Sequence, residues 1–284
     1  MPVYERGYTS WQPSGRQAYP PWWVIARRGI VGPLRKRGLL FLLVLAWIPA
    51  VVKGTIIFVK ARTGDLLDLV GGNWTSIAPG GFLAFLEGQR FFVFLLLALV
   101  GAGLVAVDRR ENGLSLYFSR PLNLVDYVAG KLLIVLFTYL LVTLAPVYAL
   151  CFFGYLVGSG ATGAEMLLQI PAQATVYALY TGSSMGLVLL AMSSLGKRAI
   201  FVTVWWTILF MGSEAVSSLV TVAGLDGLQA VNFAGQYHNA GALIFGAAPR
   251  LAISPWLSLA LTLGYAALAV AVLHRRIRPV EVVS

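Results

Sequence analysis

The chain has 284 residues, of which 58% are hydrophobic and only 11% are charged, and its mean hydropathy is +0.80. A soluble globular chain carries about 25% charged residues, so this composition excludes an ordinary soluble protein and indicates an all-α integral membrane protein. The formal net charge of +10 does not indicate nucleic-acid binding, because no groove-reading motif accompanies it. Basic residues in membrane proteins instead gather on the cytoplasmic side.

Residues 1–38 form a polar and basic N-terminal segment with no cleavable signal peptide visible. Its stretch PPWWVIARRGIVG predicts a short interfacial helix, because Pro21 suits a first turn and Trp22 and Trp23 are typical of the headgroup level. Arg27 and Arg28 supply the charge of a basic amphipathic helix that lies flat on a membrane. An ordinary aromatic flank of the first span explains the pattern equally well.

Six apolar stretches follow, each long enough to cross about 30 Å of hydrocarbon as a helix of roughly 17–25 residues. Together they predict a six-helix transmembrane domain over 39–273, followed by a tail of residues 274–284. The spans lie near 39–59, 91–107, 132–157, 172–195, 199–223 and 255–273.

Proline at position 49 is tolerated within the first span, because neighbouring helices can satisfy the freed carbonyl. The connections 60–90, 158–171 and 224–250 are expected to be loops without a separate folded domain.

Most of the 21 basic residues lie on one side of these spans. They occur in the N-terminal segment, between the second and third spans, between the fourth and fifth spans, and in the tail. The opposite side has Lys60, Arg62, Arg90 and Arg250. This asymmetry predicts a multi-pass protein of the cell inner (plasma) membrane with both termini and segment 108–131 in the cytoplasm.

Segment 108–131, DRRENGLSLYFSRPLNLVDYVAGK, is a charged connection between the second and third spans. Asp108 and Glu111 match a capping box and predict the start of a short helix. Arg120-Pro121 would end that helix, because the residue before proline avoids the helical conformation. Three apolar residues at helical spacing would form one face of it: Leu114, Tyr117 and Phe118.

A second capped helix is predicted after the proline. Asn123 and Asp126 repeat the capping pattern, and the helix would continue through Tyr127 and Lys131 into the third span. A connection that only joined two spans would need only a few residues. The apolar face of the first helix therefore indicates a contact, which a partner protein, the membrane surface or the bundle itself would satisfy equally well.

This segment resembles the first cytoplasmic loop of ABC-2 type transporter permeases. The resemblance rests on Glu111, Gly113, the apolar stretch Leu114 to Phe118, Pro121 and the pair Gly130-Lys131. The six-span layout, the internal termini and the basic interfacial helix extend it over most of the chain. It implies a membrane subunit that pairs with a second permease copy, as a homodimer or heterodimer, and docks on cytosolic ABC ATPase subunits.

In that family the loop acts as a coupling helix seated in a groove on the ATPase. The resemblance therefore implies a set of ATPase-coupling residues: Asp108, Glu111, Gly113, Leu114, Tyr117, Phe118, Arg120 and Pro121. ATP-driven closure of the ATPase dimer would move this helix and shift the spans between inward-facing and outward-facing states.

The chain itself is expected not to be an enzyme. Neither Gly130-Lys131 nor Gly196-Lys197 lies in the G-x-x-x-x-G-K-[ST] pattern of a phosphate-binding loop. We therefore expect no cofactor in this chain, with ATP and Mg²⁺ bound by the partner ATPase. One cysteine and two distant histidines give no cluster with metal-ligand spacing.

The stretch Gly182-Ser183-Ser184-Met185-Gly186 matches both the nucleophile-elbow pattern G-x-S-x-G and the helix-packing pattern G-x-x-x-G. Neither histidine is placed to act as a base at the same depth. Helix packing is therefore favoured over an intramembrane hydrolase that would rest on Ser184 alone.

Glu214 lies within the fifth apolar stretch, nearer its outer side. A carboxylate at the bilayer centre costs roughly 2.5–3.5 kcal/mol, so such a residue is a functional suspect. We interpret Glu214 as a gate or pathway candidate. The family resemblance also allows a re-entrant turn around Ser213 to Val222, which would give Glu214 the same role. A water-exposed or paired structural carboxylate explains its presence equally well.

The predicted function is the membrane-spanning permease subunit of an ATP-driven ABC transporter, an exporter, that couples ATP hydrolysis by a partner ATPase to substrate translocation. The alternative is an ATP-independent secondary transporter or channel. Charges within the spans that have partners would favour this alternative, and the sequence offers almost none.

Overall fold

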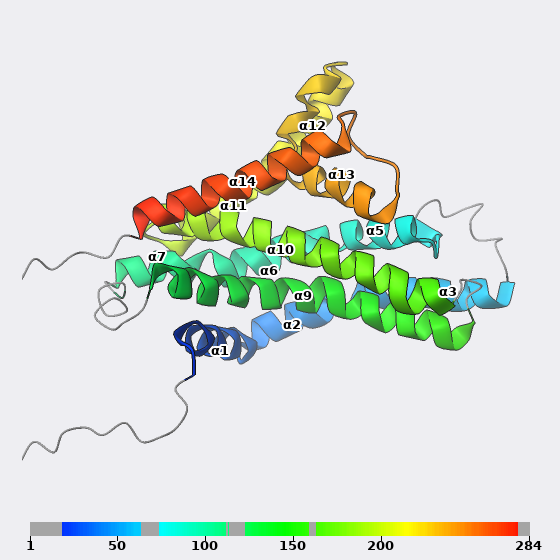
Figure 1. The fold of residues 1–284 in the computed structure, drawn as a ribbon, viewed down its shortest axis with the longest axis horizontal. Coiled ribbons are helices and arrows are strands. Elements are labelled where there is room, and N and C mark those ends of the chain that lie inside the picture. Colours follow the sequence, from blue (N-terminus) through cyan, green and yellow to red (C-terminus); the bar gives the residue numbers. More distant parts are fainter. Residues whose placement is uncertain (1–18, 64–73, 112, 114–122, 159–162, 278–284) are drawn as a thin grey trace, which may run out of the picture.

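A computed structural model of the chain describes residues 19–63, 74–111, 113, 123–158 and 163–277. These residues are helical almost throughout and contain no strand. Figure 1 shows the resulting bundle. Its helices are α1 (Pro21–Leu34), α2 (Arg37–Ala46), α3 (Ile48–Thr63), α5 (Pro79–Gly88), α6 (Arg90–Gly101), α7 (Gly103–Arg110), α9 (Leu124–Val157), α10 (Ile170–Leu195), α11 (Ala199–Thr207), α12 (Ser213–Val222), α13 (Phe233–Phe245) and α14 (Pro255–Arg276).

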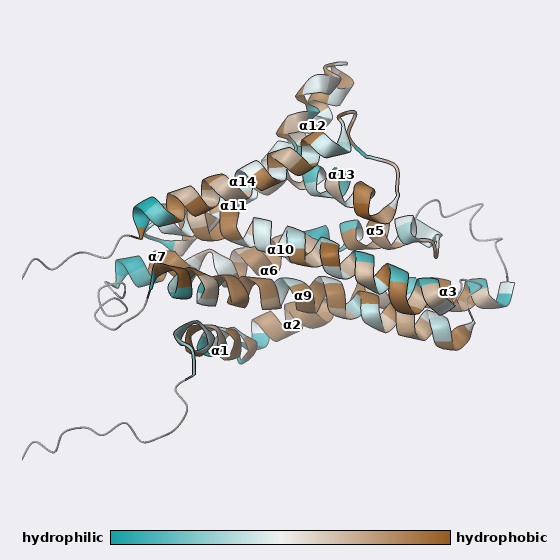
Figure 2. Cartoon of the chain, viewed as in Figure 1, coloured by the Kyte–Doolittle hydropathy of each residue, from teal (hydrophilic) through white to brown (hydrophobic). Residues whose placement is uncertain are grey.

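Six continuous helical stretches of the described chain are long and apolar enough to cross a membrane, as predicted. In Figure 2 the apolar colour dominates the middle of the bundle, whereas hydrophilic residues gather where α7 and α14 end. This pattern is that of a multi-pass membrane protein. The stretches are Arg37–Thr63, Arg90–Arg110, Leu124–Val157, Glu165–Leu195, Ala199–Val222 and Pro255–Arg276.

Several of these stretches are not single regular helices. The first is interrupted at Trp47, two residues before Pro49, which has no N–H and whose ring crowds the preceding turn. The second is interrupted at Ala102, between α6 and α7. The fourth begins with a π-helical turn, η2 (Glu165–Gln169), and the fifth contains a second one, η3 (Ile208–Gly212). Such turns are frequently found at functional sites.

The centre of the bundle is formed by α9 and α10, which pack closely along their lengths. A Cβ atom at Gly182 of α10 would lie 2.8 Å from Cδ1 of Tyr139, and one at Gly186 would lie 2.8 Å from Cδ1 of Leu132. A larger residue at either position would push against side chains of α9, so the two glycines allow the helices to approach closely. The helix-packing interpretation of G-x-x-x-G is therefore confirmed.

Two connections that we expected to be loops contain short buried helices. α5 and α13 are 10 and 13 residues long, which is too short to cross a membrane. Both pack against α10 and against each other. The expectation that 60–90 and 224–250 are loops is therefore wrong, since α5 and α13 pack within the bundle.

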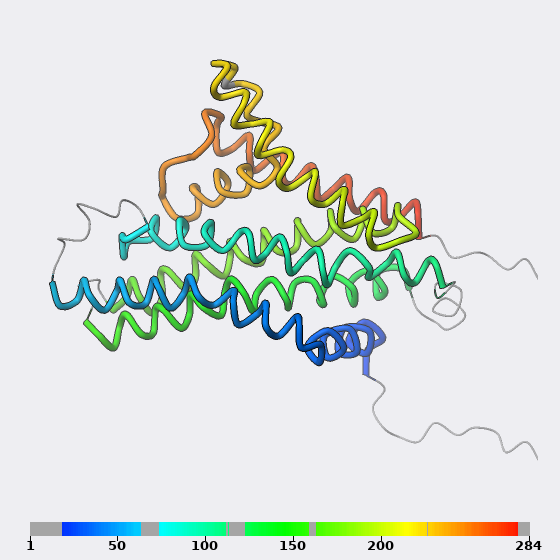
Figure 3. Tube along the Cα trace, turned by 180° about the vertical axis from the view of Figure 1, so that it is seen from behind, coloured from blue at the N-terminus to red at the C-terminus, as the bar shows by residue number. Residues whose placement is uncertain are grey.

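α12 continues α11 and η3 as a helix and leans away from the rest of the bundle, as Figures 1 and 3 show from opposite sides. Ser213–Val222, around which the resemblance allowed a re-entrant turn, is helical. The chain reverses after it, through Gly224, whose φ of 70° suits glycine, and the 3₁₀ turn η4 (Asp226–Val231). α13 then returns to the core.

α1 is a separate helix and not the start of the first span. In Figure 1 it is seen nearly end-on while α9 runs across the view, so the two helices cross steeply. The contact is close, because a Cβ atom at Gly130 of α9 would lie 2.9 Å from both the Trp22 carbonyl oxygen and Ile25 Cβ. α1 therefore packs across the first turns of α9.

Candidate functional site

The two ends of segment 108–131 are joined by a largely buried ion pair. Lys131 Nζ of α9 lies 2.8 Å from Asp108 Oδ2 of α7, and the two side chains are 9% and 18% exposed. The Tyr127 hydroxyl donates to the same carboxylate oxygen at 2.7 Å. We call these three residues the Asp108 cluster. It fastens the end of α7 to the first turns of α9.

The capping-box prediction for Asp108 and Glu111 is wrong. Asp108 lies within α7, which continues the second span, so a helix is already present where a new one was expected to begin. Its carboxylate binds Tyr127 and Lys131 instead of a backbone N–H. Glu111 is the C-cap of α7 and forms an exposed ion pair with Arg110 at 2.9 Å.

Of the other predicted coupling residues, one lies among the described residues. Gly113 is described and has a helical backbone. The predicted apolar-faced helix and its end lie outside the described residues, with Leu114, Tyr117, Phe118, Arg120 and Pro121. The second predicted helix is confirmed, because α9 starts at Leu124 after an extended Asn123, although the Asn123 side chain makes no capping bond.

α10 is attached to the same end of the second span. The Ser193 hydroxyl donates to the Ala102 carbonyl at 2.8 Å and accepts from the N–H groups of Val105 and Ala106, each at 3.0 Å. These bonds satisfy backbone groups freed by the interruption between α6 and α7. The Arg109 guanidinium donates to the Ser194 carbonyl. α7, α9 and α10 are thus linked by specific polar contacts around segment 108–131.

A second group of charged residues lies beyond the other end of the same span. Glu87 of α5 accepts from the Arg250 guanidinium, and its Oε2 lies 3.1 Å from His238 Nδ1 of α13. Arg90 of α6 and Arg250 also contact Glu214 of α12, with Nη2 to Oε1 distances of 2.7 and 2.9 Å. We call these five residues the Glu87 cluster.

Glu214 is therefore a paired carboxylate. Its side chain is 27% exposed, and it joins α12 to α6 and to the connection that precedes α14. Since α12 leans away from the bundle, these ion pairs are its main polar links to the core, together with Ser213, whose hydroxyl accepts from the Phe233 N–H at 3.1 Å. Glu214 is well placed to control the position of α12.

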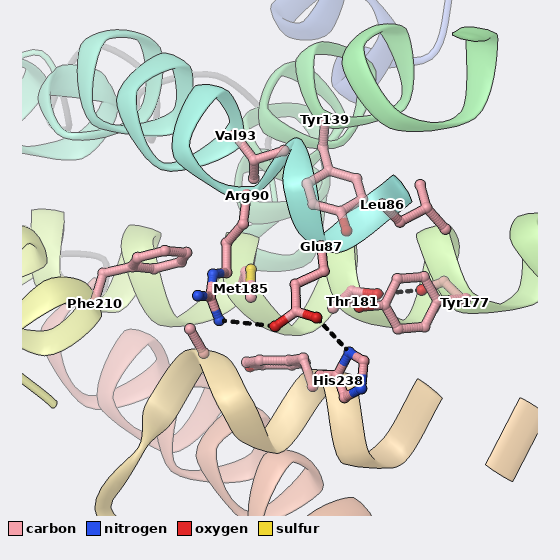
Figure 4. A pocket seen from close by; sticks show the side chains of 12 residues that line it. Leu86, Glu87, Arg90, Val93, Tyr139, Tyr177, Thr181, Met185, Phe210 and His238 are labelled. Carbon is pink, nitrogen blue, oxygen red and sulfur yellow. Dashed lines mark hydrogen bonds and ion pairs between the residues drawn. The ribbon is translucent and has the colours of Figure 1, made fainter. Parts of the chain in front are cut away.

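The Glu87 cluster borders a small cavity of about 30 Å³. Figure 4 shows Glu87 between Arg90 and His238, with Met185 and Thr181 of α10 beyond it. That volume corresponds to about two water molecules. Four hydroxyl groups line the cavity besides the charges, those of Tyr139, Tyr177, Thr181 and Tyr237. The site is thus polar but closed to anything much larger than water.

The charge state of Glu87 follows from these contacts. Burial alone would raise the pKa of the carboxyl group, but His238 and the positive charges of Arg250 and Arg90 lower it to about 2. Burial likewise opposes the charge on Arg250, whereas Glu87 and Glu214 raise its pKa. Glu87 and Arg250 are therefore held in their ionised forms at neutral pH.

Ser184 has no catalytic partner in the described part of the chain. Its hydroxyl is 2.9 Å from the Tyr237 hydroxyl and donates to the Thr262 carbonyl at 3.1 Å. These bonds join α10 to α13 and α14. The buried hydroxyl is a structural link, and no histidine contacts it.

Lys53 of α3 is fully buried and does not reach the interface, as a lysine anchor would. Its ammonium donates to the carbonyl oxygens of Trp74 and Ser76 at 2.5 and 2.8 Å. It also lies 5.5 and 5.6 Å from the ring centroids of Trp74 and Phe82. Lys53 therefore fixes the start of α5, and through α5 the position of Glu87.

Sequence reasoning did not find the Glu87 cluster. Arg90 and Arg250 contribute only to the predicted charge asymmetry across the membrane, and no local motif marks Glu87 or His238. The available signal was a few charged residues in otherwise apolar connections. It was insufficient, because the five residues come from four separate parts of the chain.

No group of three or more histidine, cysteine, aspartate or glutamate residues in the described ranges is arranged to hold a metal ion. A scan against models of protein families finds no match, and neither does a search of curated proteins.

Proposed function

We propose that this chain is the membrane-spanning permease subunit of an ATP-driven ABC transporter of the ABC-2 type. The transporter would work as an exporter. It would sit in the cell inner membrane with both termini in the cytoplasm. The uneven distribution of basic residues supports this orientation, together with the hydrophilic ends of α7 and α14 in Figure 2. A second permease copy and cytosolic ATPase subunits would complete the transporter.

The observation that carries the proposal is the Asp108 cluster. A coupling element transmits force only if its ends are fastened to the helices that it must move. Here Asp108 and Lys131, the two ends of segment 108–131, join α7 to α9. Ser193 joins α10 to the start of α7. A push on the segment would therefore reach three spans at once.

The Glu87 cluster would act as a gate at the opposite side of the membrane. Its ion pairs join α5, α6, α12 and α13 around a cavity too small for a substrate. Passage would require these contacts to separate. The π-helical turn η3 precedes α12 and would let that helix move relative to α11.

α1 would serve as the interfacial helix. Its steep crossing of α9 would place it along the membrane plane if α9 spans the bilayer (Figure 1). Because Gly130 seats α1 directly next to Lys131 of the Asp108 cluster, movement of the coupling segment would also move this helix.

The test uses the tagged full chain purified with its associated proteins in lipid nanodiscs. We expect a P-loop ATPase to be retained in stoichiometric amount and the complex to hydrolyse ATP. Glu111→Ala, or Gly113→Leu combined with Pro121→Ala, should uncouple ATP hydrolysis from transport while membrane insertion is retained. Unchanged docking and transport in these variants would rule out the assigned role of the segment.

The Glu87 cluster also favours a second candidate, an ATP-independent secondary transporter or channel. Buried charges with partners are the feature that such a function needs, and Glu87 contacts both His238 and Arg250 in this way. Flux through vesicles containing only this chain, driven by an ion gradient without ATP, would support this candidate against the first.

A further inference from the structure

The outward face of α1 carries a groove that the bundle does not fill. The groove has a volume of about 540 Å³. Three arginines and two aromatic residues dominate its lining: Arg27, Arg28, Arg35, Tyr19 and Trp23. Val24 and Val31 also line it, with side chains that are 45% and 41% exposed, together with Gly32. The groove thus combines positive charge with exposed apolar surface.

The three arginines have no acidic partner. Across the described chain, the ion pairs involve other basic residues, and no acidic residue occurs within 19–63. Three guanidinium groups without a counter-charge repel one another and attract an anion. The guanidinium fork matches the oxygens of phosphate in particular, which it can bind through two parallel hydrogen bonds.

The backbone that carries the groove is fixed. The opposite face of α1 packs on α9, where Ala26 is fully buried and Gly130 allows the two backbones to approach closely. Arg27 and Arg28 therefore project from a helix that cannot turn its charged face away, and Arg35 directly follows the end of that helix. A fixed array of donors loses less conformational entropy on binding than arginines on a flexible tail would.

We propose that this groove binds the headgroup of an anionic phospholipid. The phosphate would lie among Arg27, Arg28 and Arg35, and Trp23 and Tyr19 would occupy the headgroup region that such rings prefer. Val24 and Val31 would contact the glycerol and the first carbons of the acyl chains. The exposed apolar side chains favour a lipid over free inorganic phosphate, because the free ion would leave them in water.

The experiment counts lipids on the full-length protein by native mass spectrometry, in micelles of a zwitterionic detergent. Phosphatidylglycerol and phosphatidylcholine are added separately at equal concentration. We expect phosphatidylglycerol to bind more tightly, and Arg27→Gln with Arg28→Gln to weaken it about 30-fold, since each basic group near an anionic surface contributes about fivefold. Arg27→Lys with Arg28→Lys keeps the charge but removes the forks, and should weaken binding several-fold.

The matched control is Lys197→Gln with Arg198→Gln, which removes the same charge from the exposed turn between α10 and α11. It should leave phosphatidylglycerol binding unchanged. Equal loss in this control, or equal binding by both lipids, would overturn the proposal. Displacement of phosphatidylglycerol by an equal concentration of inorganic phosphate would overturn the lipid as the occupant. None of these results depends on ATP coupling.

Discussion

At the scale of single residues, two carboxylates organise the charges of this protein. Asp108 accepts from Tyr127 and pairs with Lys131, and Glu87 is surrounded by Arg90, His238 and Arg250. Both carboxylates are mostly shielded from water, so removal of a charged partner from either one would destabilise the fold. Glu111, by contrast, forms an exposed pair, which stabilises a fold very little.

Replacement of Asp108 by Asn tests this difference. The variant keeps the shape of the side chain but removes the negative charge that lies 2.8 Å from the largely buried Lys131 ammonium, so we expect it to lose about 1.5–3 kcal/mol of stability. Thermal unfolding in detergent should show a clearly lowered Tm. Glu111→Gln is the control and should have the same Tm as the wild type. A wild-type Tm for Asp108→Asn would mean that the Asp108 cluster does not fasten α7 to α9.

The low pKa of Glu87 predicts a pH dependence. Because folding lowers the pKa of this group from 4.5 to about 2, its ionisation stabilises the fold fully above pH 4.5. That contribution falls as the pH drops towards 2. The stability difference between wild type and Glu87→Gln, measured by chemical unfolding, should therefore be largest above pH 4.5 and shrink below it. A difference that is constant from pH 7 to pH 3 would contradict the assignment.

At the scale of helices, the structure depends on close packing where side chains are absent. Gly182 and Gly186 let α10 meet α9, and Gly130 lets α1 meet the same helix. α9 therefore packs closely against α10 and α1, and glycine allows the close approach in both contacts. This arrangement places Lys131, Tyr127 and the start of α9 at the junction of three elements, which is where the coupling proposal needs them.

A leucine at Gly182 tests the packing of α10 on α9. The new side chain would overlap Tyr139 and Leu136, and we expect overpacking to cost about 1–3 kcal/mol. Gly264→Leu in α14 is the matched control, since a Cβ atom there meets nothing within 4 Å. Tm values of the two variants decide the question, and equal values would show that the G-x-x-x-G contact carries no stability.

At the scale of the whole molecule, the six spans could be predicted because apolar length is a local property of the sequence. The start of α9 after Asn123 could be predicted from the local capping pattern of Asn123 and Asp126, although the Asn123 side chain makes no capping bond. The Glu87 cluster, the burial of Lys53 and the inward return of α5 and α13 could not be predicted. Each depends on residues from distant parts of the chain meeting across the bundle, and no local pattern records such a meeting.

The prediction that Asp108 caps a helix is wrong for a related reason. Asp at the start of a charged stretch matches an N-cap locally, but Lys131 lies one full connection away and binds the carboxylate in the folded chain. Tertiary contact overrode the local signal. The same contact is what makes Asp108 relevant to the coupling of helices across the molecule.

The central claim is that segment 108–131 passes force from a partner ATPase to the spans. The most direct measurement is the distance between spin labels on the exposed residues Val125 of α9 and Leu219 of α12, in the purified complex with its ATPase. Trapping with ATP and vanadate should shift this distance in the wild type, and Asp108→Asn should abolish the shift while ATP is still hydrolysed. An unchanged distance in the wild type, or an equal shift in Asp108→Asn, would contradict the account.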